Sequence, residues 1–388
     1  MFQELNDWFD DFKKIRHDLH SHPEIGFNTL RTSNIVADYL TEWGFKVHKG
    51  IGKTGVVGQL KCGSGSKTIG LRADMDALPM EENTGLPYSS TIQGASHSCG
   101  HDGNTTMLLA GARLLAKRKN FNGTLNVIFQ PAEEGQGGGP AMIGDGLFER
   151  FPCDYVFALH SMPNAENNKM FYVQPGAMLS SSDRVTINIT GRGGHGAEPQ
   201  NTIDPVVVGA TVVQALQSIV SRNTAPKDRA VVTVGSFLAG REGSYNIIPE
   251  TAQMLLSVRS MDNSVRKMII ENIQRIATHV CSAMGAKAEV CVQSIAPAVV
   301  NDSFAANLAR EVGIDVFSEE ECPQSFQPYM NSEDFAYMLE ACPGAYALLN
   351  NGNTPNCHQP DYDFNDDLIL RGGTYWTALV ERYLREQE

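Results

Sequence analysis

The order of strand-like and helix-like segments constrains the fold of this chain more than any other feature of its sequence. In the first half, short runs rich in β-branched residues alternate with longer helical patterns, which is typical of a parallel or mixed α/β sheet. The apolar spacing of Thr105–Lys117, over a length that few strands reach, predicts a helix. Strands are expected at Thr54–Leu60, Thr68–Ala73, Thr124–Phe129 and Asp154–Leu159.

A second pattern begins after Met178. One strand and one helix are followed by two strands, a helix and a last strand, which is the order of a small α+β, ferredoxin-like sandwich. The strands are expected at Arg184–Thr190, Arg229–Ala239, Thr251–Val258 and Ala288–Ile295, and the helices at Pro205–Val220 and Asn263–Met284. We therefore expect residues 182–294 to form a domain inserted between two parts of an α/β domain, residues 1–181 and 295–388.

The α/β pattern resumes in the last quarter of the chain. Helices are expected near Ser303–Val312, Ser332–Ala341 and Asp367–Arg385, with a strand at Ala345–Asn350. The two parts of the α/β pattern are thus expected to form one domain around a shared sheet.

Composition excludes several classes of protein. The chain of 388 residues has 31 Lys and Arg against 44 Asp and Glu, a net charge of −13 that argues against a nucleic-acid partner. With 42% hydrophobic residues it can form a large core, so we expect a soluble globular protein. The longest apolar stretch, Val206–Leu216, is too short to span a membrane. Eight cysteines without a repeating spacing, and no signal-peptide pattern in Met1–Lys14, favour a cytoplasmic location.

The residues most informative about function begin with a cysteine and a histidine two positions apart. Cys99 and His101 lie in a glycine-punctuated segment that we expect to be a loop before a helix. Thiolate and imidazole are both good ligands for zinc and similar divalent ions. Taken alone, the pair also fits a loop cysteine beside a surface histidine.

Two adjacent acids, Glu133 and Glu134, follow the expected strand Thr124–Phe129. In an open α/β sheet, ligands bind beyond the carboxyl ends of the strands. Two carboxylates there can divide the work, one binding a metal ion and the other accepting a proton from water. A solvated acidic turn is the alternative for the pair alone.

Two further histidines favour a metal centre. His160 comes at the end of an expected strand, and His358 lies in a loop before the last helix. Either one alone fits a structural or surface residue. Together the candidate ligands number five, with Glu133 left as a base, which suits a two-metal hydrolytic centre: Cys99, His101, Glu134, His160 and His358.

Several motifs in the same order resemble those of the metal-dependent aminoacylase and carboxypeptidase amidohydrolases, and the resemblance covers nearly the whole chain. The branch that it resembles most contains bacterial hippurate hydrolases and plant indole-acetyl-amino-acid hydrolases. The motifs are Arg72–Pro79, Cys99–Gly103, Gln130–Gly135, Gly191–Gly196, Ser332–Phe335 and Asp363–Asp366. The resemblance implies a catalytic α/β domain with two divalent metal ions (zinc, manganese, cobalt or nickel), and a smaller lid domain that mediates dimerisation.

The resemblance also assigns roles to individual residues. It makes the five candidates the metal ligands and Glu133 the general base. Asp76 is expected to orient a ligating histidine, and its alternative is a buried acid that caps a turn. Other branches have a His-x-Asp pair where this chain has Asp74 and Asp76, so Asp74 is not expected to bind metal. Many members have a histidine where this chain has Asn104, which leaves the role of that position open.

The inserted domain offers three further candidates, His195, Asn246 and Arg259. His195 lies in the glycine-rich motif Gly191–Gly196. The resemblance implies that this histidine reaches an active site, often that of the partner subunit, and helps to bind the scissile carbonyl. Arg259 is a candidate for binding the free carboxylate of an amino acid. The alternatives are a turn-capping histidine and an arginine in a surface ion pair.

These observations lead to a functional hypothesis. The chain is expected to hydrolyse the amide bond of N-acyl amino acids, with Glu133 removing a proton from a water that bridges two metal ions. Three alternatives stay open: a dipeptidase or carboxypeptidase acting on short peptides, a hydrolase with Cys99 as nucleophile, and a non-catalytic binding relative. The expected partners are a small-molecule substrate and further copies of the chain, in a homodimer or homotetramer.

Overall fold

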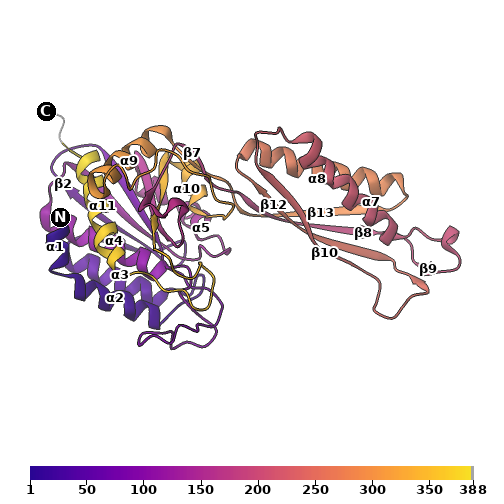
Figure 1. Ribbon diagram of the computed structural model, residues 1–388, viewed down its shortest axis with the longest axis horizontal. Coiled ribbons are helices and arrows are strands. Elements are labelled where there is room, and N and C mark those ends of the chain that lie inside the picture. The colour runs from indigo at the N-terminus through magenta and orange to yellow at the C-terminus, as the bar shows by residue number, and fades with distance from the viewer. Residues whose placement is uncertain (386–388) are drawn as a thin grey trace. The chain divides into compact units, whose positions relative to one another are not determined.

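The computed structural model describes residues 1–385, which fold as two compact units (Figure 1). The second unit comprises Leu179–Val299 and Pro328–Glu333. The first comprises Met1–Met178, Val300–Gln327 and Asp334 to Arg385.

A seven-stranded sheet forms the centre of the first unit. Its strands, in spatial order, are β1 (Lys46–Ile51), β2 (Gly55–Cys62), β4 (Gly123–Gln130), β3 (Thr68–Asp74), β5 (Tyr155–Met162), β15 (Gly344–Asn350) and β6 (Phe171–Tyr172). Strands β4, β3, β5 and β15 are parallel, whereas β2 and β6 run antiparallel to them. The carboxyl ends of the four parallel strands therefore meet at one edge of the sheet, where α/β proteins bind their ligands.

Helices cover both faces of this sheet, as shown by the burial of every residue of β15. One group of helices contributes residues to the main apolar cluster, and a second group lies outside that cluster. The first group is α1 (Phe2–Asn6), α2 (Phe9–Ser21), α3 (Leu30–Glu42), α4 (His101–Arg118), α9 (Ser303–Phe317) and α11 (Asp367–Tyr383). The second is α5 (Gly138–Gly144), α6 (Leu147–Arg150) and α10 (Phe335–Ala341).

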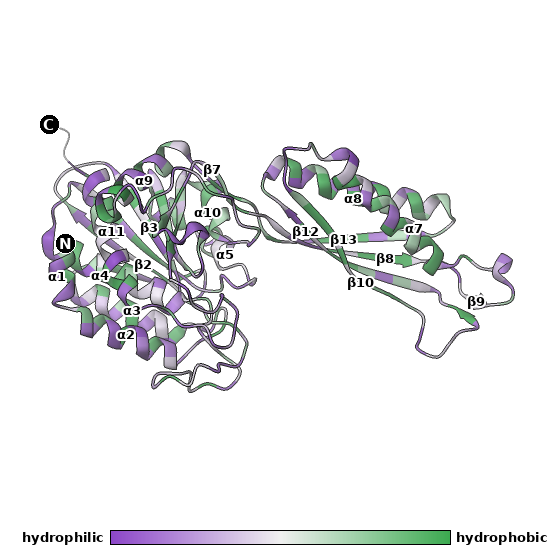
Figure 2. Cartoon of the chain, viewed as in Figure 1, coloured by the Kyte–Doolittle hydropathy of each residue, from purple (hydrophilic) through white to green (hydrophobic). Residues whose placement is uncertain are grey.

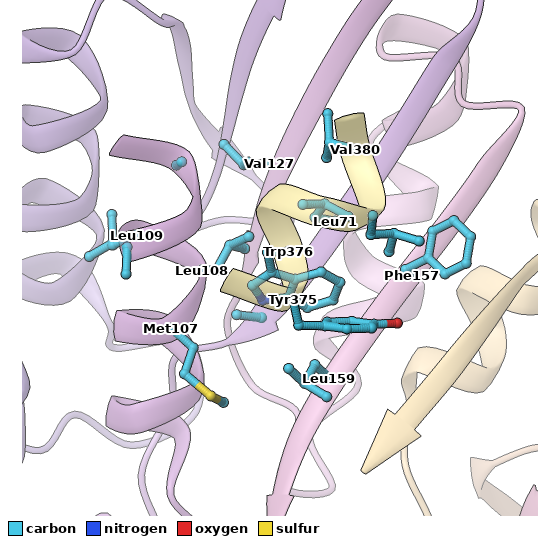
Figure 3. Packing of buried hydrophobic residues seen from close by; sticks show 14 of the residues in the cluster. Leu71, Met107, Leu108, Leu109, Val127, Phe157, Leu159, Tyr375, Trp376 and Val380 are labelled. Carbon is cyan, nitrogen blue, oxygen red and sulfur yellow. The ribbon is translucent and has the colours of Figure 1, made fainter. Parts of the chain in front are cut away.

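The main core lies between α4, α11 and the sheet. Figure 3 shows Trp376 and Tyr375 of α11 close to Leu108 of α4 and to side chains of the strands. Figure 2 shows mixed polar and apolar colouring on α2 and α3, whose outer faces contact solvent. Because parallel strands are buried on both faces, they read as continuous apolar runs, and this explains why the sequence predicts them well.

Helix α4 begins four residues earlier than the sequence predicted, and this corrects one expectation about the site. His101 was expected in a loop before the helix, but it is the first residue of α4. The apolar spacing did not reveal this turn, because almost every side of α4 is buried and its first turn carries polar residues such as Asp102 and Asn104. Helix α10, in contrast, starts later than predicted, at Phe335 rather than at Ser332.

The second unit has a four-stranded antiparallel sheet in the order β10 (Ala230–Ala239), β12 (Thr251–Ser260), β8 (Ser182–Thr190) and β13 (Lys287–Ala296). Residues of β12 alternate between exposed and buried, because only one face of the sheet is covered by α7 (Pro205–Ser218) and α8 (Asn263–Ala283). The strand order and the βαββαβ connection are those of a ferredoxin-like sandwich. The predicted fold class, an α/β domain with an inserted α+β domain, is confirmed.

A short segment far along the chain also belongs to the second unit. Ser180 donates its backbone N–H to the carbonyls of Tyr329 and Asn331, at 3.2 and 2.9 Å. The sequence reading placed residues 328–333 with the α/β domain, because no local pattern signals a contact over about 150 positions.

In the described part of the chain, no helix is both long and apolar enough to cross a membrane.

A buried polar network connects the start of α4 with α2. His20 Nδ1 lies 2.8 Å from Asp102 Oδ2, and His20 Nε2 lies 3.3 Å from Glu82 Oε1. Burial alone would lower the pKa of His20, but the carboxylates of Asp102 and Glu82 raise it to about 9. His20 is therefore a protonated ion-pair partner at neutral pH.

This network predicts a loss of stability at alkaline pH. The raised pKa of His20 means that its contribution is complete below its unfolded value near 6.5 and is lost as the pH rises through about 9. The full contribution is about 3 kcal/mol, or a melting-temperature change of roughly 5 °C in a unit of this size. Melting temperatures between pH 6.5 and 10 should fall more steeply in the wild type than in His20→Gln. The exposed His279→Gln is the control, and equal slopes for His20→Gln and wild type would contradict the prediction.

Candidate metal centre

The candidate metal ligands of the first unit gather at the edge where the parallel strands end. Glu133 and Glu134 follow β4, and His160 lies near the end of β5. His101 begins α4 with Cys99 two residues before it, and His358 lies in the loop between β15 and α11. The fold thus brings together residues that are up to about 260 positions apart in the sequence.

Unusual backbone conformations hold this edge in place. Gly100, between the two ligand candidates Cys99 and His101, has φ 80°, and a Cβ there would collide with Tyr362 and Ser161. Ala132 and His358 also have positive φ values, 56° and 66°, although neither is glycine. Such conformations cost free energy and persist where surrounding contacts enforce them, which is common at functional sites.

The ligand atoms form overlapping groups. One contains Cys99, His101 and His160, and another contains Cys99, Glu134 and His358, each with its atoms within 4.8 Å of one another. Cys99 Sγ lies 3.8 Å from His160 Nε2, and Glu134 Oε1 lies 3.3 Å from His358 Nε2 and 3.9 Å from His101 Nε2. Because Cys99 belongs to both groups, its sulfur lies where two neighbouring ions could share one ligand.

Asp76 contacts three of the residues at this edge, namely Glu133, Glu134 and His101. Its two carboxylate oxygens accept the backbone N–H groups of Glu133 and Glu134, at 2.9 and 3.1 Å. One of these oxygens also lies 3.6 Å from His101 Nδ1. Asp76 therefore contacts the backbone of both acids and faces one ring nitrogen of a ligand candidate, which fits an orienting role.

Glu133 lies at the same edge, next to Glu134. One of its carboxylate oxygens lies within 4.8 Å of the ligand atoms of His101 and Glu134. Glu133 Oε1 accepts the backbone N–H of Asp334 at 3.3 Å. Its side chain is half-buried, so it combines a fixed position with access to solvent.

Nearby carboxylates raise the pKa values of two candidate ligands, the buried His101 and the exposed His358. Burial lowers the pKa of His101, but the carboxylates of Asp74, Asp76 and Glu134 outweigh it and raise the pKa well above its ordinary value. The hydrogen bond with Glu134 raises the pKa of His358.

The surroundings of the Cys99 thiol raise its pKa, whereas those of an activated cysteine nucleophile lower it. A hydrogen bond with Cys357 raises its pKa well above the ordinary value, and burial and nearby carboxylates add to the rise. Reactive cysteines have lowered pKa values, so in the protein without a cation Cys99 is a poor nucleophile.

The residues present fit divalent transition-metal ions. Within residues 1–385, neither ring nitrogen of His101 has a hydrogen-bond partner although both are buried. Buried polar atoms normally have partners, so an orphaned imidazole surrounded by carboxylates and a thiol points to a cation as its partner. The donor set of sulfur, nitrogen and oxygen suits zinc, cobalt, nickel or manganese.

The candidates in the second unit do not all lie together. His195 in β9 (Gly194–His195) pairs with Ile247 of β11 (Ile247–Ile248), directly beside Asn246. Arg259 lies near the opposite end of β12, where its guanidinium donates to the carbonyl of Met330 at 3.2 Å. The eight residue steps from Thr251 to Arg259 span about 26 Å in a strand, so within one chain Arg259 is separated from His195 and Asn246.

Sequence reasoning missed several buried residues that support the site. Arg72 pairs with Asp74 at 2.7 Å, and the Asp334 carboxylate accepts hydrogen bonds from Gln130 and the backbone of Gly139, at 2.6 and 2.8 Å. The signal for Arg72 was a charged residue inside an apolar strand. Asp334 lies in one of the motifs of the resemblance, but its partners could not be read from the sequence.

Comparisons with known proteins agree with this geometry. Residues 70–382 match the model of peptidase family M20/M25/M40. A hippurate hydrolase from Campylobacter jejuni is 46% identical, covering 99% of this chain and all of that one. The thermostable carboxypeptidase 1 of Saccharolobus solfataricus is 34% identical over 97% of this chain and 95% of its own length. A dinuclear metal-binding M20 peptidase from Bacillus subtilis has a structure with a TM-score of 0.85 and 28% identity, covering 98% of this chain and 99% of that one.

Proposed function

Because the chain belongs to peptidase family M20/M25/M40 and is a metal-dependent amidohydrolase, we propose that it cleaves N-acyl amino acids such as benzoyl-glycine into a carboxylic acid and a free amino acid. The observation that carries the proposal is the gathering of five candidate ligand residues and the half-buried Glu133 at one edge of the sheet. The similarity to a hippurate hydrolase along the full length supports this substrate class.

Cys99, His101, Glu134, His160 and His358 would hold two divalent ions. When bound, such ions polarise a carbonyl and make water more acidic, which is the chemistry that amide hydrolysis needs. Glu133 accepts the proton of the attacking water and passes it to the leaving nitrogen. The backbone N–H groups of Glu133 and Glu134 donate to Asp76, and these hydrogen bonds fix the position of the base relative to the neighbouring ligand.

The second unit supplies groups for the substrate in this proposal. His195 donates a hydrogen bond to the developing oxyanion, with Asn246 beside it, and Arg259 pairs with the free carboxylate of the amino acid. One small substrate can meet both His195 and Arg259 only if one of them comes from another copy of the chain, because a single second unit separates them. A homodimer or homotetramer is accordingly part of the proposal, as is a cytoplasmic location.

A carboxypeptidase or dipeptidase is the second candidate, and similarity to a thermostable carboxypeptidase favours it. The two functions use the same chemistry and differ in the acyl group. A panel of benzoyl-glycine, N-acetyl amino acids, dipeptides and benzoyl-glycine amide separates them by kcat/KM. We expect benzoyl-glycine or an N-acetyl amino acid to be the best substrate. Benzoyl-glycine amide, which lacks the carboxylate, should be a poorer substrate than benzoyl-glycine. Dipeptides cleaved more efficiently than every N-acyl amino acid would replace this proposal with the second candidate.

A further inference from the structure

Asn104 in the first turn of α4 is a buried side chain to which the proposed chemistry gives no task. It is 1% exposed and lies three residues after His101. Its Nδ2 donates to Asp74 Oδ1 at 2.9 Å, and its Oδ1 accepts the backbone N–H of Ser161 at 3.1 Å. The amide can take only this orientation, because a carboxylate has no proton to donate and a backbone N–H cannot accept one.

Each partner of Asn104 lies next to a candidate ligand. The same oxygen of Asp74 is 4.0 Å from His101 Nε2. The carbonyl of Ser161 is 2.7 Å from His160 Nδ1, which makes this nitrogen the donor and directs Nε2 toward Cys99. The rings of His101 and His160 are 5.4 Å apart and perpendicular, so Asn104 contacts the supports of both from one position.

We infer that Asn104 is a positioning residue of the metal centre, which sets the orientation of His160 through Ser161 and holds the Asp74 carboxylate in place beside His101. This inference rests on the proposed metal centre. Groups that hold ligands in this way typically contribute 10- to 100-fold to metal affinity.

The inference explains the departure at this position from many family members. A neutral imidazole has one donor and one acceptor nitrogen, as a carboxamide has one donor and one acceptor group. Asparagine can therefore replace histidine at position 104 with both hydrogen bonds retained. An aspartate cannot, because its carboxylate would face Asp74 Oδ1 without a proton to share, and like charges at that distance repel.

Metal affinity measured without turnover tests the inference. Cobalt is titrated into metal-free wild type, Asn104→Leu, Asn104→Asp and Asn104→His against a competing chelator, and the absorption bands of bound cobalt are recorded. Asn104→Leu and Asn104→Asp should bind cobalt about 10- to 100-fold more weakly, with altered bands. Asn104→His should stay within about threefold of the wild type, since it can supply both hydrogen bonds.

A matched control separates positioning from general stability. Asn126 in β4 is also fully buried, and its amide bonds to Gln59 and the carbonyl of Pro152, at 3.1 Å each. Asn126→Leu should lower the melting temperature without changing cobalt affinity. All titrations are run well below the melting temperature of each metal-free variant, so that only folded protein is compared.

The outcomes assign failure to one proposal or the other. If Asn104→Leu and Asn104→Asp bind cobalt as tightly as the wild type, or if Asn126→Leu weakens binding equally, Asn104 is only a packing residue and the inference is overturned. If the wild type itself binds no cobalt, the proposed metal centre fails. Weak binding in Asn104→His would also contradict the inference, because it would show that the two hydrogen bonds are not what the position supplies.

Discussion

Glu133→Gln is expected to lower kcat for benzoyl-glycine by about 10²- to 10⁴-fold while leaving metal content unchanged. Glutamine keeps the size of the side chain and can still accept the N–H of Asp334, but it cannot take up a proton. The five candidate ligands are not altered by this change. Steady-state kinetics with metal analysis on the same preparation measures both quantities.

Two further results show whether Glu133 is the base. Glu311→Gln, in an exposed ion pair with Arg382 on another surface, is the matched control and should retain wild-type kinetics. A Glu133→Gln variant with turnover within about tenfold of wild type would rule out Glu133 as the base. Loss of metal together with turnover would instead make Glu133 a ligand.

Cys99→Ala is expected to remove metal and turnover together. The sulfur of Cys99 belongs to both overlapping groups of ligand atoms, so its loss takes one donor from each. We expect fewer than two ions per chain after dialysis and a loss of metal affinity of at least about 100-fold, more than an orienting residue contributes. Cys291→Ala, which changes an exposed thiol in β13, should bind two ions as the wild type does.

The same variant tests the alternative that Cys99 is a nucleophile. That reading predicts that Cys99→Ala keeps its metal and loses only chemistry, and that the wild type works after chelation. Two ions bound with wild-type affinity in Cys99→Ala would contradict the ligand role.

The sequence predicted those parts of the fold that local patterns encode. The parallel strands β3, β4, β5 and β15 are continuous apolar runs, and β12 alternates strictly, so their positions could be found within a few residues. The gathering of the ligand candidates followed from one rule, that ligands bind at the carboxyl ends of parallel strands. The family resemblance placed these residues in one site.

The remaining features depend on contacts that no local pattern contains. The first turn of α4 was hidden because its side chains are polar yet buried. The partners of Asp334 and Asn104 lie on strands and loops far away in the sequence, and hydrogen bonds of this kind leave no periodic signal. The separation of Arg259 from His195 became visible only with the strand pairing of the second unit.

The central claim, a two-metal centre that hydrolyses N-acyl amino acids, is tested most directly by adding metal back to metal-free protein in steps. Benzoyl-glycine hydrolysis and the number of zinc, manganese or cobalt ions bound per chain are measured in the same samples. The account predicts no turnover without metal and a rise that saturates when two ions are bound. Full turnover in protein freed of metal, or metal binding that never restores hydrolysis of any substrate in the panel, would contradict it.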